Sequence, residues 1–138
     1  MKQSMLIENI LSKDNLNDAY LQVVRNKGAA GIDGMEYKTL LSHLRKNGAQ
    51  LKESIRNQTY KPMPVKRVEI PKDNGKKREL GIPTVTDRVI QQAIVQVLTP
   101  IFEPQFSDNS YGFRPRRNAH QAVRKVVEYA NEGYRYTV

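Results

Sequence analysis

The stretch IPKDNGKKRELGIPTVTDRVIQQAI, residues 70–94, joins a tight turn rich in positive charge to an apolar helical pattern. Asp73-Asn74-Gly75 is a turn sequence, and the residues on both sides of it alternate between apolar and charged types. Cations beside a turn repel one another at such close range. Those found here are Lys72, Lys76, Lys77 and Arg78. Their crowding predicts an anionic partner at this turn.

The parity of the apolar residues selects the turn of a β-hairpin, which we expect over residues 65–82. In a two-residue turn, Ile70 and Leu80 would lie on opposite faces of the hairpin. A three-residue loop with a left-handed Gly75 places both on one face and sets Ile70 opposite Arg78. We therefore predict the three-residue loop.

This register makes Lys72 and Arg78 diagonal cross-strand neighbours, about 7–8 Å apart at the backbone. Strand residues beside a tight turn are held rigidly, so they lose less entropy than free side chains when they bind a phosphate. The lysine ammonium acts as a point charge, and the planar guanidinium of the arginine can donate two parallel hydrogen bonds to a phosphate. The alternative is a solvated hairpin tip, where lysines prevent edge pairing.

The net charge of the 138-residue chain is +9, and two stretches carry all of it. Residues 61–82 hold seven cations and three anions, residues 114–125 hold five cations and no anion, and the rest is neutral. Focused basic stretches are the footprint of a phosphate-bearing partner such as a nucleic acid. No apolar run approaches the roughly 18 residues of a membrane span, so we expect a cytoplasmic protein without a membrane partner.

The second basic stretch, SDNSYGFRPRRNAHQAV, residues 107–123, leads into a helix capped by Asn118. Arginines before a helix N-terminus make a ready phosphate site, and Tyr111 and Phe113 offer flat faces to a base or sugar. The arginines are Arg114, Arg116 and Arg117. In the alternative, Phe113 is a core residue and the arginines pair with acids further along the helix.

A glycine loop, NKGAAGIDG at residues 26–34, is a third candidate, because its amides can approach a phosphate closely. Its spacing matches neither the P-loop nor the dinucleotide-binding motif, so a plain connection between helices is an equal alternative. Nothing in the chain indicates catalysis, because His43 and His120 are far apart and no carboxylates are paired for two-metal chemistry.

Hydrophobic periodicity predicts helices on both sides of the hairpin, and hence an α+β class that is mostly helical. Before it we expect helices over 7–11, from a cap at Asp14 or Asn15 to Gly28, and over 40–55 with a break allowed at Asn47-Gly48. After it, Thr84 and Asp87 cap a helix that Pro100 and Pro104 end.

A last helix runs from Asn118 to Gly133, and residues 134–138 predict the start of a strand. Its expected buried side consists of Ala119, Ala122, Val123, Val126, Val127 and Ala130.

In combination, four strings resemble the N-terminal half of group II intron reverse transcriptases/maturases, in particular the compact bacterial type. They are GAAGIDG, YKPMPVKRVEIPK, GKKRELGIPTVTDRVIQQAI and LTPIFEPQFSDNSYGFRPRRNAHQAV. The resemblance covers the chain from about Leu11 to Val138. It implies an N-terminal extension with the glycine loop at 1–36, the fingers subdomain of a right-hand polymerase at 37–133, and the start of a truncated palm strand at 134–138.

The resemblance also implies roles. Lys72 and Arg78 would bind the phosphates of the incoming dNTP, with Ile82 near the nucleobase or template. Template RNA, intron RNA or an RNA/DNA duplex would contact the remaining candidates. These are Asn26, Lys27, Gly28, Gly31, Lys61, Arg67, Tyr111, Phe113, Arg114, Arg116 and Arg117.

In that family the metal-binding aspartates follow a strand like YRYTV, so we expect this chain to be inactive alone and the full-length RNA-directed DNA polymerase to bind Mg²⁺. The parent would belong to a mobile element and assist splicing of its intron. Surface left open by truncation makes a homodimer possible. The alternative is a non-enzymatic RNA-binding module that assists intron splicing.

Overall fold

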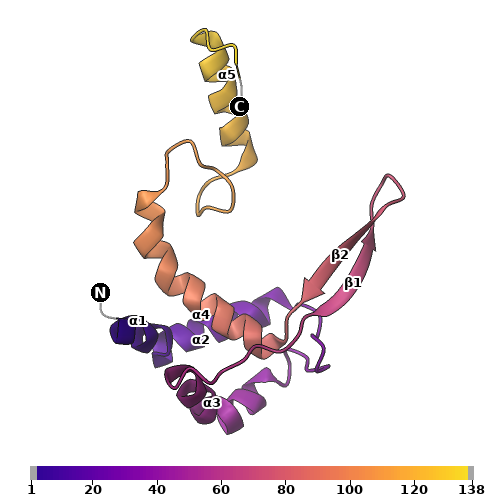
Figure 1. Ribbon diagram of the computed structural model, residues 1–138, viewed down its shortest axis with the longest axis vertical. Helices are drawn as coiled ribbons and strands as arrows, with labels where there is room; N and C mark the ends of the chain where they lie inside the picture. Colours follow the sequence, from indigo (N-terminus) through magenta and orange to yellow (C-terminus); the bar gives the residue numbers. More distant parts are fainter. Residues whose placement is uncertain (1–2, 137–138) are drawn as a thin grey trace. The chain divides into compact units, whose positions relative to one another are not determined.

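The computed structural model describes residues 3–136, and it confirms a mostly helical chain with one antiparallel hairpin (Figure 1). The chain forms two compact units, 1–98 and 99–138. The elements are α1 Gln3–Ile10, α2 Lys13–Asn26, α3 Leu40–Arg56, β1 Lys66–Pro71, β2 Lys77–Ile82, α4 Val85–Phe102, the 3-10 turn η1 Glu103–Gln105, and α5 Ala119–Asn131.

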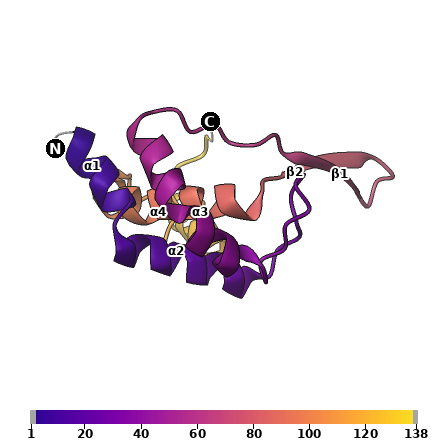
Figure 2. The same cartoon turned by 90° about the horizontal axis from the view of Figure 1, so that it is seen from below.

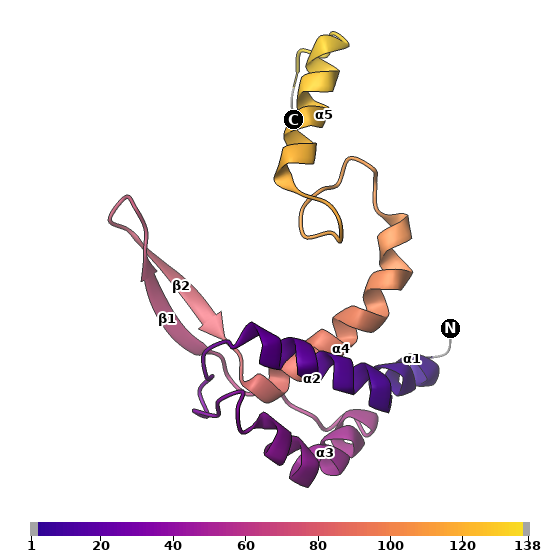
Figure 3. The same cartoon turned by 180° about the vertical axis from the view of Figure 1, so that it is seen from behind.

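The core of the first unit lies between α2, α3 and α4, which are next to one another in all three ribbon views (Figures 2 and 3). It is small because the helices are short and each contributes only a narrow apolar stripe. Its buried members are Ala19 and Val23 of α2, Leu40 of α3, and Val85, Val89 and Ala93 of α4. No helix in the described part of the chain is both long and apolar enough to span a bilayer.

The ends of α2 differ from the prediction. Its N-cap is Ser12, whose hydroxyl accepts from the Asn15 N–H at 3.4 Å. Asn15 itself is used elsewhere, because its amide donates to the carbonyl oxygens of Ile10 and Ala93. The left-handed residue at the C-terminal end is Lys27, with φ 47°, rather than Gly28.

α3 and α4 continue past the residues predicted to interrupt them. α3 is unbroken at Asn47, whose amide donates to the His43 carbonyl one turn earlier. α4 runs through Pro100 and ends at Phe102, whereas Pro104 lies in the following 3-10 turn. A proline so close to a helix end costs little, because few backbone hydrogen bonds follow it.

The hairpin has the predicted register. Val68 pairs with Leu80 and Ile70 with Arg78, and Gly75 is left-handed with φ 74°. The Lys72 N–H donates to the Lys76 carbonyl at 2.7 Å, which closes the loop after three residues. The three-residue loop is thus confirmed.

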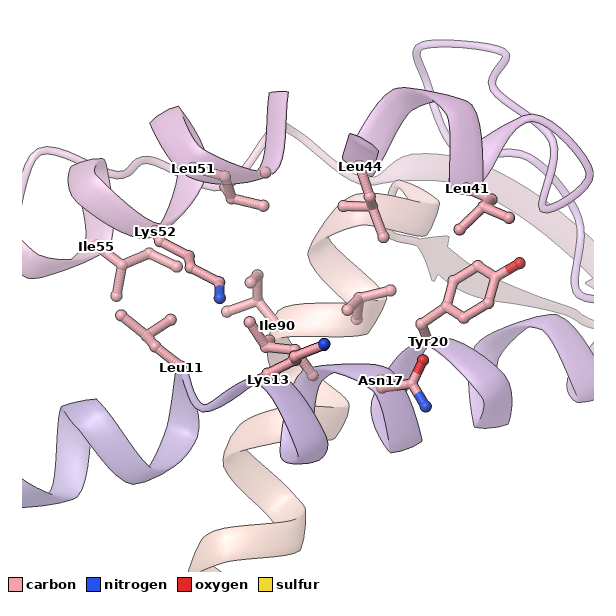
Figure 4. Close-up of a pocket in the computed structure, with 13 residues that line it drawn as sticks. Leu11, Lys13, Asn17, Tyr20, Leu41, Leu44, Leu51, Lys52, Ile55 and Ile90 are labelled. Atoms are coloured by element: carbon pink, nitrogen blue, oxygen red, sulfur yellow. The ribbon is translucent and has the colours of Figure 1, made fainter. Parts of the chain in front are cut away.

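An apolar pocket of about 240 Å³ opens between α2, α3 and α4 (Figure 4). The side chains of Leu11 and Tyr20 point towards Leu44, Leu51 and Ile55 across it. Its lining holds no carboxylate or histidine, and its ionisable side chains are two lysines and one tyrosine. The basic residues singled out in the sequence lie outside this pocket.

The second unit contains η1, α5 and the loop between them. Asn118 and Gln121 form the predicted capping box of α5, and Gly133 follows its end with φ 99°. The predicted buried side is wrong: Val123, Val126 and Val127 are all more than half exposed. Among residues 99–136, no other helix or strand covers them. Tyr134–Tyr136 have no regular structure, and the last two residues of the predicted strand lie outside the described residues.

Candidate nucleic-acid interface

The two faces of the hairpin differ in charge, because residues that pair directly across an antiparallel ladder share a face. One face holds Lys66, Lys72, Lys76 and Arg78, with no carboxylate. The other face holds Arg67, Glu69, Lys77 and Glu79, and Lys77 forms an ion pair with Glu69. On these two faces, the net positive charge of the hairpin is therefore confined to one side.

Apolar side chains accompany the cations on this cationic face. Ile70 and Leu80 remain exposed there, beside the half-buried Val68. Among the described residues, Lys72 and Arg78 make no ion pair with a carboxylate. A rigid apolar platform with unpaired cations fits a nucleotide or a nucleic-acid strand, which combines phosphates with flat bases. Ile82, the predicted neighbour of a base, is half-buried at the end of this face.

Asp87, at the start of α4, is only 4% exposed, and its hydrogen bonds hold the segment that precedes the hairpin against this helix. This carboxylate accepts from the Tyr60 hydroxyl, from the Met63 N–H at 3.1 Å and from the Thr84 hydroxyl at 2.7 Å. Thr84 in turn accepts from the Asp87 N–H, as the predicted cap requires. Sequence reasoning found the cap but missed the anchor, because nothing in the sequence ties Tyr60 to α4.

Tyr60 makes the stability of this anchor depend on pH. Burial, and then the hydrogen bond to Asp87, raise the pKa of Tyr60 above its ordinary value of 10. The folded state holds this proton more tightly, so the stabilisation is complete below pH 10 and is lost as the pH rises above it. We expect the free energy of unfolding, measured with urea between about pH 8 and pH 11, to fall less in Tyr60→Phe than in the wild type. Tyr136→Phe, at an exposed site, should keep the wild-type slope. Identical slopes in all three proteins would contradict the assignment.

The glycine loop is held against the start of α4. A Cβ on Gly31 would lie 2.7 Å from the Cα of Thr84, and the Arg88 guanidinium occupies the space that a Cβ on Gly28 would need. Arg88 also donates to the Ala29 carbonyl. Asn26 and Lys27 are exposed, whereas Gly31 is buried. Gly31 therefore sets the position of the loop, and its exposed neighbours are the ones open to a ligand.

Gly31→Ala should destabilise the first unit by about 1–3 kcal/mol, because the added methyl must push the loop away from α4. Gly48→Ala is the matched control. It lies within α3 with open space around it, and it should stabilise the chain by up to about 1 kcal/mol. Urea midpoints report both changes, and a Gly31→Ala protein as stable as the wild type would show that the close contact is absent.

Arg114 of the second basic stretch is buried within its own loop, with 8% of its side chain exposed. Its guanidinium donates to the Glu103 carboxylate and to the carbonyl oxygens of Glu103, Ser107 and Ser110. These four hydrogen bonds, with an ion-pair contact from Nη2 to the Glu103 carboxylate, engage all three nitrogens of the guanidinium. Arg114 therefore holds the loop together in this conformation.

The other members of this stretch lie at the surface. Phe113 and Arg116 are both left-handed, with φ 56° and 62°, and both are exposed. Such backbone is unfavourable for residues other than glycine and clusters at functional sites. Arg117 contacts the carbonyl and carboxylate of Asp108 and lies 5.3 Å from the centre of the Tyr111 ring. The alternative interpretation placed Phe113 in the core and paired the arginines with acids further along the helix. Phe113 is exposed instead, and the partner of Arg117 is Asp108 in the loop before the helix.

The remaining cationic candidates lie in the first unit. Lys61, before the hairpin, is exposed, and Arg67 is exposed on the face opposite Lys72 and Arg78. The hairpin and the glycine loop both lie in the first unit, 1–98, whereas residues 111–117 lie in the second unit, 99–138. In residues 3–136 no three histidine or carboxylate side chains come together as metal ligands.

Comparison with known proteins gives consistent matches. The family model described as reverse transcriptase (RNA-dependent DNA polymerase) matches residues 70–138. Protein YkfC of Escherichia coli strain K12 is 39% identical over 123 residues, which is 88% of this chain and 32% of that protein. The group II intron-encoded protein LtrA of Lactococcus lactis subsp. cremoris is 39% identical over 122 residues, 88% of this chain and 20% of LtrA. The putative COX1/OXI3 intron 2 protein of Saccharomyces cerevisiae is 32% identical over 77% of this chain and 12% of its own length. The chain thus spans a third or less of the length of each of these relatives.

Proposed function

This chain belongs to the reverse transcriptase family of group II intron proteins, and on that premise we propose that it is the fingers region of an RNA-directed DNA polymerase and intron maturase. In this role Lys72 and Arg78 bind the phosphates of the incoming dNTP. Template RNA, intron RNA or the RNA/DNA duplex binds along the other exposed cations and the glycine loop. The observation that carries the proposal is the hairpin face that holds Lys66, Lys72, Lys76 and Arg78 without a carboxylate, beside exposed apolar side chains.

The second unit would contribute contacts of a different kind. Arg116 meets the nucleic-acid backbone, and Phe113 and Tyr111 stack on a base or sugar. Arg117 can keep its place over Tyr111 while it contacts a phosphate at its free edge. We assign Arg114 to loop shape, since all three nitrogens of its guanidinium are engaged within the chain.

These residues position substrates and neutralise phosphate charge, both of which lower the barrier of nucleotidyl transfer. The transfer itself uses metal ions held by carboxylates, and the described residues do not form such a site. Magnesium binding, polymerisation and a homodimer therefore stay predictions for a longer parent protein, and we expect no primer extension by the 138-residue chain alone.

RNA binding is tested by fluorescence anisotropy with a 5′-labelled oligouridylate and the 138-residue chain, at salt concentrations between about 50 and 200 mM. We expect affinity to fall steeply with salt, because each phosphate contact releases a counterion. A chain that fails to bind at low salt, or binds with no salt dependence, would contradict the proposed function.

The second candidate function is an RNA-binding module without a role in polymerisation, in which the same exposed cations contact RNA only. The two functions differ in their response to nucleotide. A polymerase fingers region should bind dNTP at the hairpin and show it as shifts of the Lys72 and Arg78 NMR signals, whereas an RNA-binding module should respond to RNA only.

A further inference from the structure

The apolar pocket between α2, α3 and α4 is large for so small a core, with a volume of about 240 Å³. The side chains of α3 that line it, Leu44, Leu51 and Ile55, are only half-buried, and Leu41 is exposed. Gly48, in the middle of this row, has open space where a Cβ would be. Benzene fits an apolar cavity of about 150 Å³, so this pocket has room for about ten non-hydrogen atoms.

Two lysines give this pocket a positively charged rim. Lys13 of α2 and Lys52 of α3 are among its lining residues, and Figure 4 shows their side chains extending into the space between the two helices. Neither lysine forms an ion pair within residues 3–136, and no carboxylate lines the pocket. Glu8, whose charge acts on Lys52, accepts two hydrogen bonds from Arg56. The rim therefore favours a ligand with an anionic group.

We propose that this pocket binds an aliphatic monocarboxylate of about eight carbon atoms. Its chain lies along Leu44, Leu51 and Ile55, and its carboxylate lies between Lys13 and Lys52. A single negative charge suits the site, because a doubly charged group would lose more hydration beside these apolar side chains. This inference is independent of the proposed nucleic-acid function, since none of the lining residues belongs to the candidate interface.

A bound ligand would hold α2 against α3, the two helices that residues 27–39 with the glycine loop connect. Because the pocket forms only when both helices are folded, the ligand binds the folded state in preference to the unfolded chain. The urea midpoint of the first unit should therefore rise with ligand concentration.

The test is an NMR titration of the methyl-labelled 138-residue chain with octanoate, 1-octanol, octylammonium and octyl phosphate, which share one chain length. We expect octanoate to shift the methyl signals of Leu44, Leu51 and Ile55. It should bind about tenfold more tightly than the neutral alcohol, because its carboxylate accepts charge-assisted hydrogen bonds from the lysines. Octylammonium should bind more weakly than the alcohol, because its charge has the same sign as the rim.

The double variant Lys13→Gln/Lys52→Gln should bind octanoate no more tightly than octanol. Its matched control is Lys38→Gln/Lys46→Gln, which removes the same charge from two exposed lysines outside the pocket. The control should keep the wild-type preference for octanoate. All four substituted side chains are free of ion pairs within the described residues, so both double variants should fold as the wild type does.

Several results would overturn the inference. Unchanged pocket signals would show that no such ligand binds, and equal affinities for octanoate, octanol and octylammonium would show that the rim does not select a carboxylate. Tighter binding of octyl phosphate than of octanoate would assign the rim to a phosphate. Equal losses in the two double variants would mean that net charge, and not the pocket, attracts the ligand. Pocket signals that move with protein concentration in the absence of ligand would assign the pocket to a second copy of the chain.

Discussion

Lys72→Ala and Arg78→Ala should each lower the affinity for the incoming nucleotide about tenfold in a longer polymerase that carries this chain. Each substitution removes a charge-assisted contact to phosphate, and such contacts contribute about 1.5–3 kcal/mol. The two side chains share the cationic face of the hairpin and have no carboxylate partner within the described residues. Their loss therefore exposes no unpaired acid, and the fold should be unaffected.

The measurement is the Michaelis constant for dNTP in steady-state primer extension on an RNA template. Lys77→Ala is the matched control, because it removes a cation from the same strand on the opposite face, where Glu69 is its partner. The control should keep the wild-type constant. If all three variants use nucleotide as the wild type does, the assignment of the cationic face to nucleotide phosphates is wrong.

Asp87→Ala should lower the free energy of unfolding by about 3 kcal/mol or more, the largest loss that we expect from a single substitution. It removes the acceptor of the Tyr60 and Thr84 hydroxyls and of the Met63 N–H. A buried donor left without a partner costs about 1–3 kcal/mol. The lead-in to the hairpin is released at the same time, so binding at the cationic face should weaken as well.

Urea unfolding compares this variant with Asp18→Ala, in which an exposed carboxylate of α2 is removed. We expect the control to lie within about 0.5 kcal/mol of the wild type. Asp87→Asn retains one acceptor oxygen and should fall between the wild type and the alanine variant. Equal urea midpoints for Asp87→Ala and Asp18→Ala would show that the buried hydrogen bonds do not anchor the hairpin.

The hairpin was predictable because its information is local. The alternation of apolar residues and the position of Gly75 leave one register that keeps Val68, Ile70 and Leu80 on a single face. The capping box at Asn118 and Gln121 was predictable for the same reason, since both partners lie within one turn.

Contacts distant in sequence were not predictable. Tyr60 and Asp87 are 27 residues apart, and Ala29 and Arg88 are 59 apart, so no periodicity links them. The glycines of the loop were the local indication of a close contact, because Gly28 and Gly31 lie where the start of α4 approaches the loop backbone. The role of Arg114 was hidden for a related reason: charge alone does not reveal that nearby carbonyl groups occupy its donors.

The prediction for α5 shows the limit of hydrophobic pattern. Helical spacing correctly identified the apolar stripe with Val123, Val126 and Val127, but the stripe is exposed in this chain. A pattern tells which side of a helix is suited to burial, and only the rest of the structure tells whether a partner is present.

The most direct test of the central claim, that nucleotide phosphates lie on the cationic face of the hairpin, is an NMR titration of the methyl-labelled chain with dNTP. Val68, Ile70 and Leu80 carry their methyl groups on that face, whereas the strand residues on the other face of the hairpin carry none. We predict that the signals of these three residues shift or broaden as dNTP is added. Unchanged signals there would contradict the account.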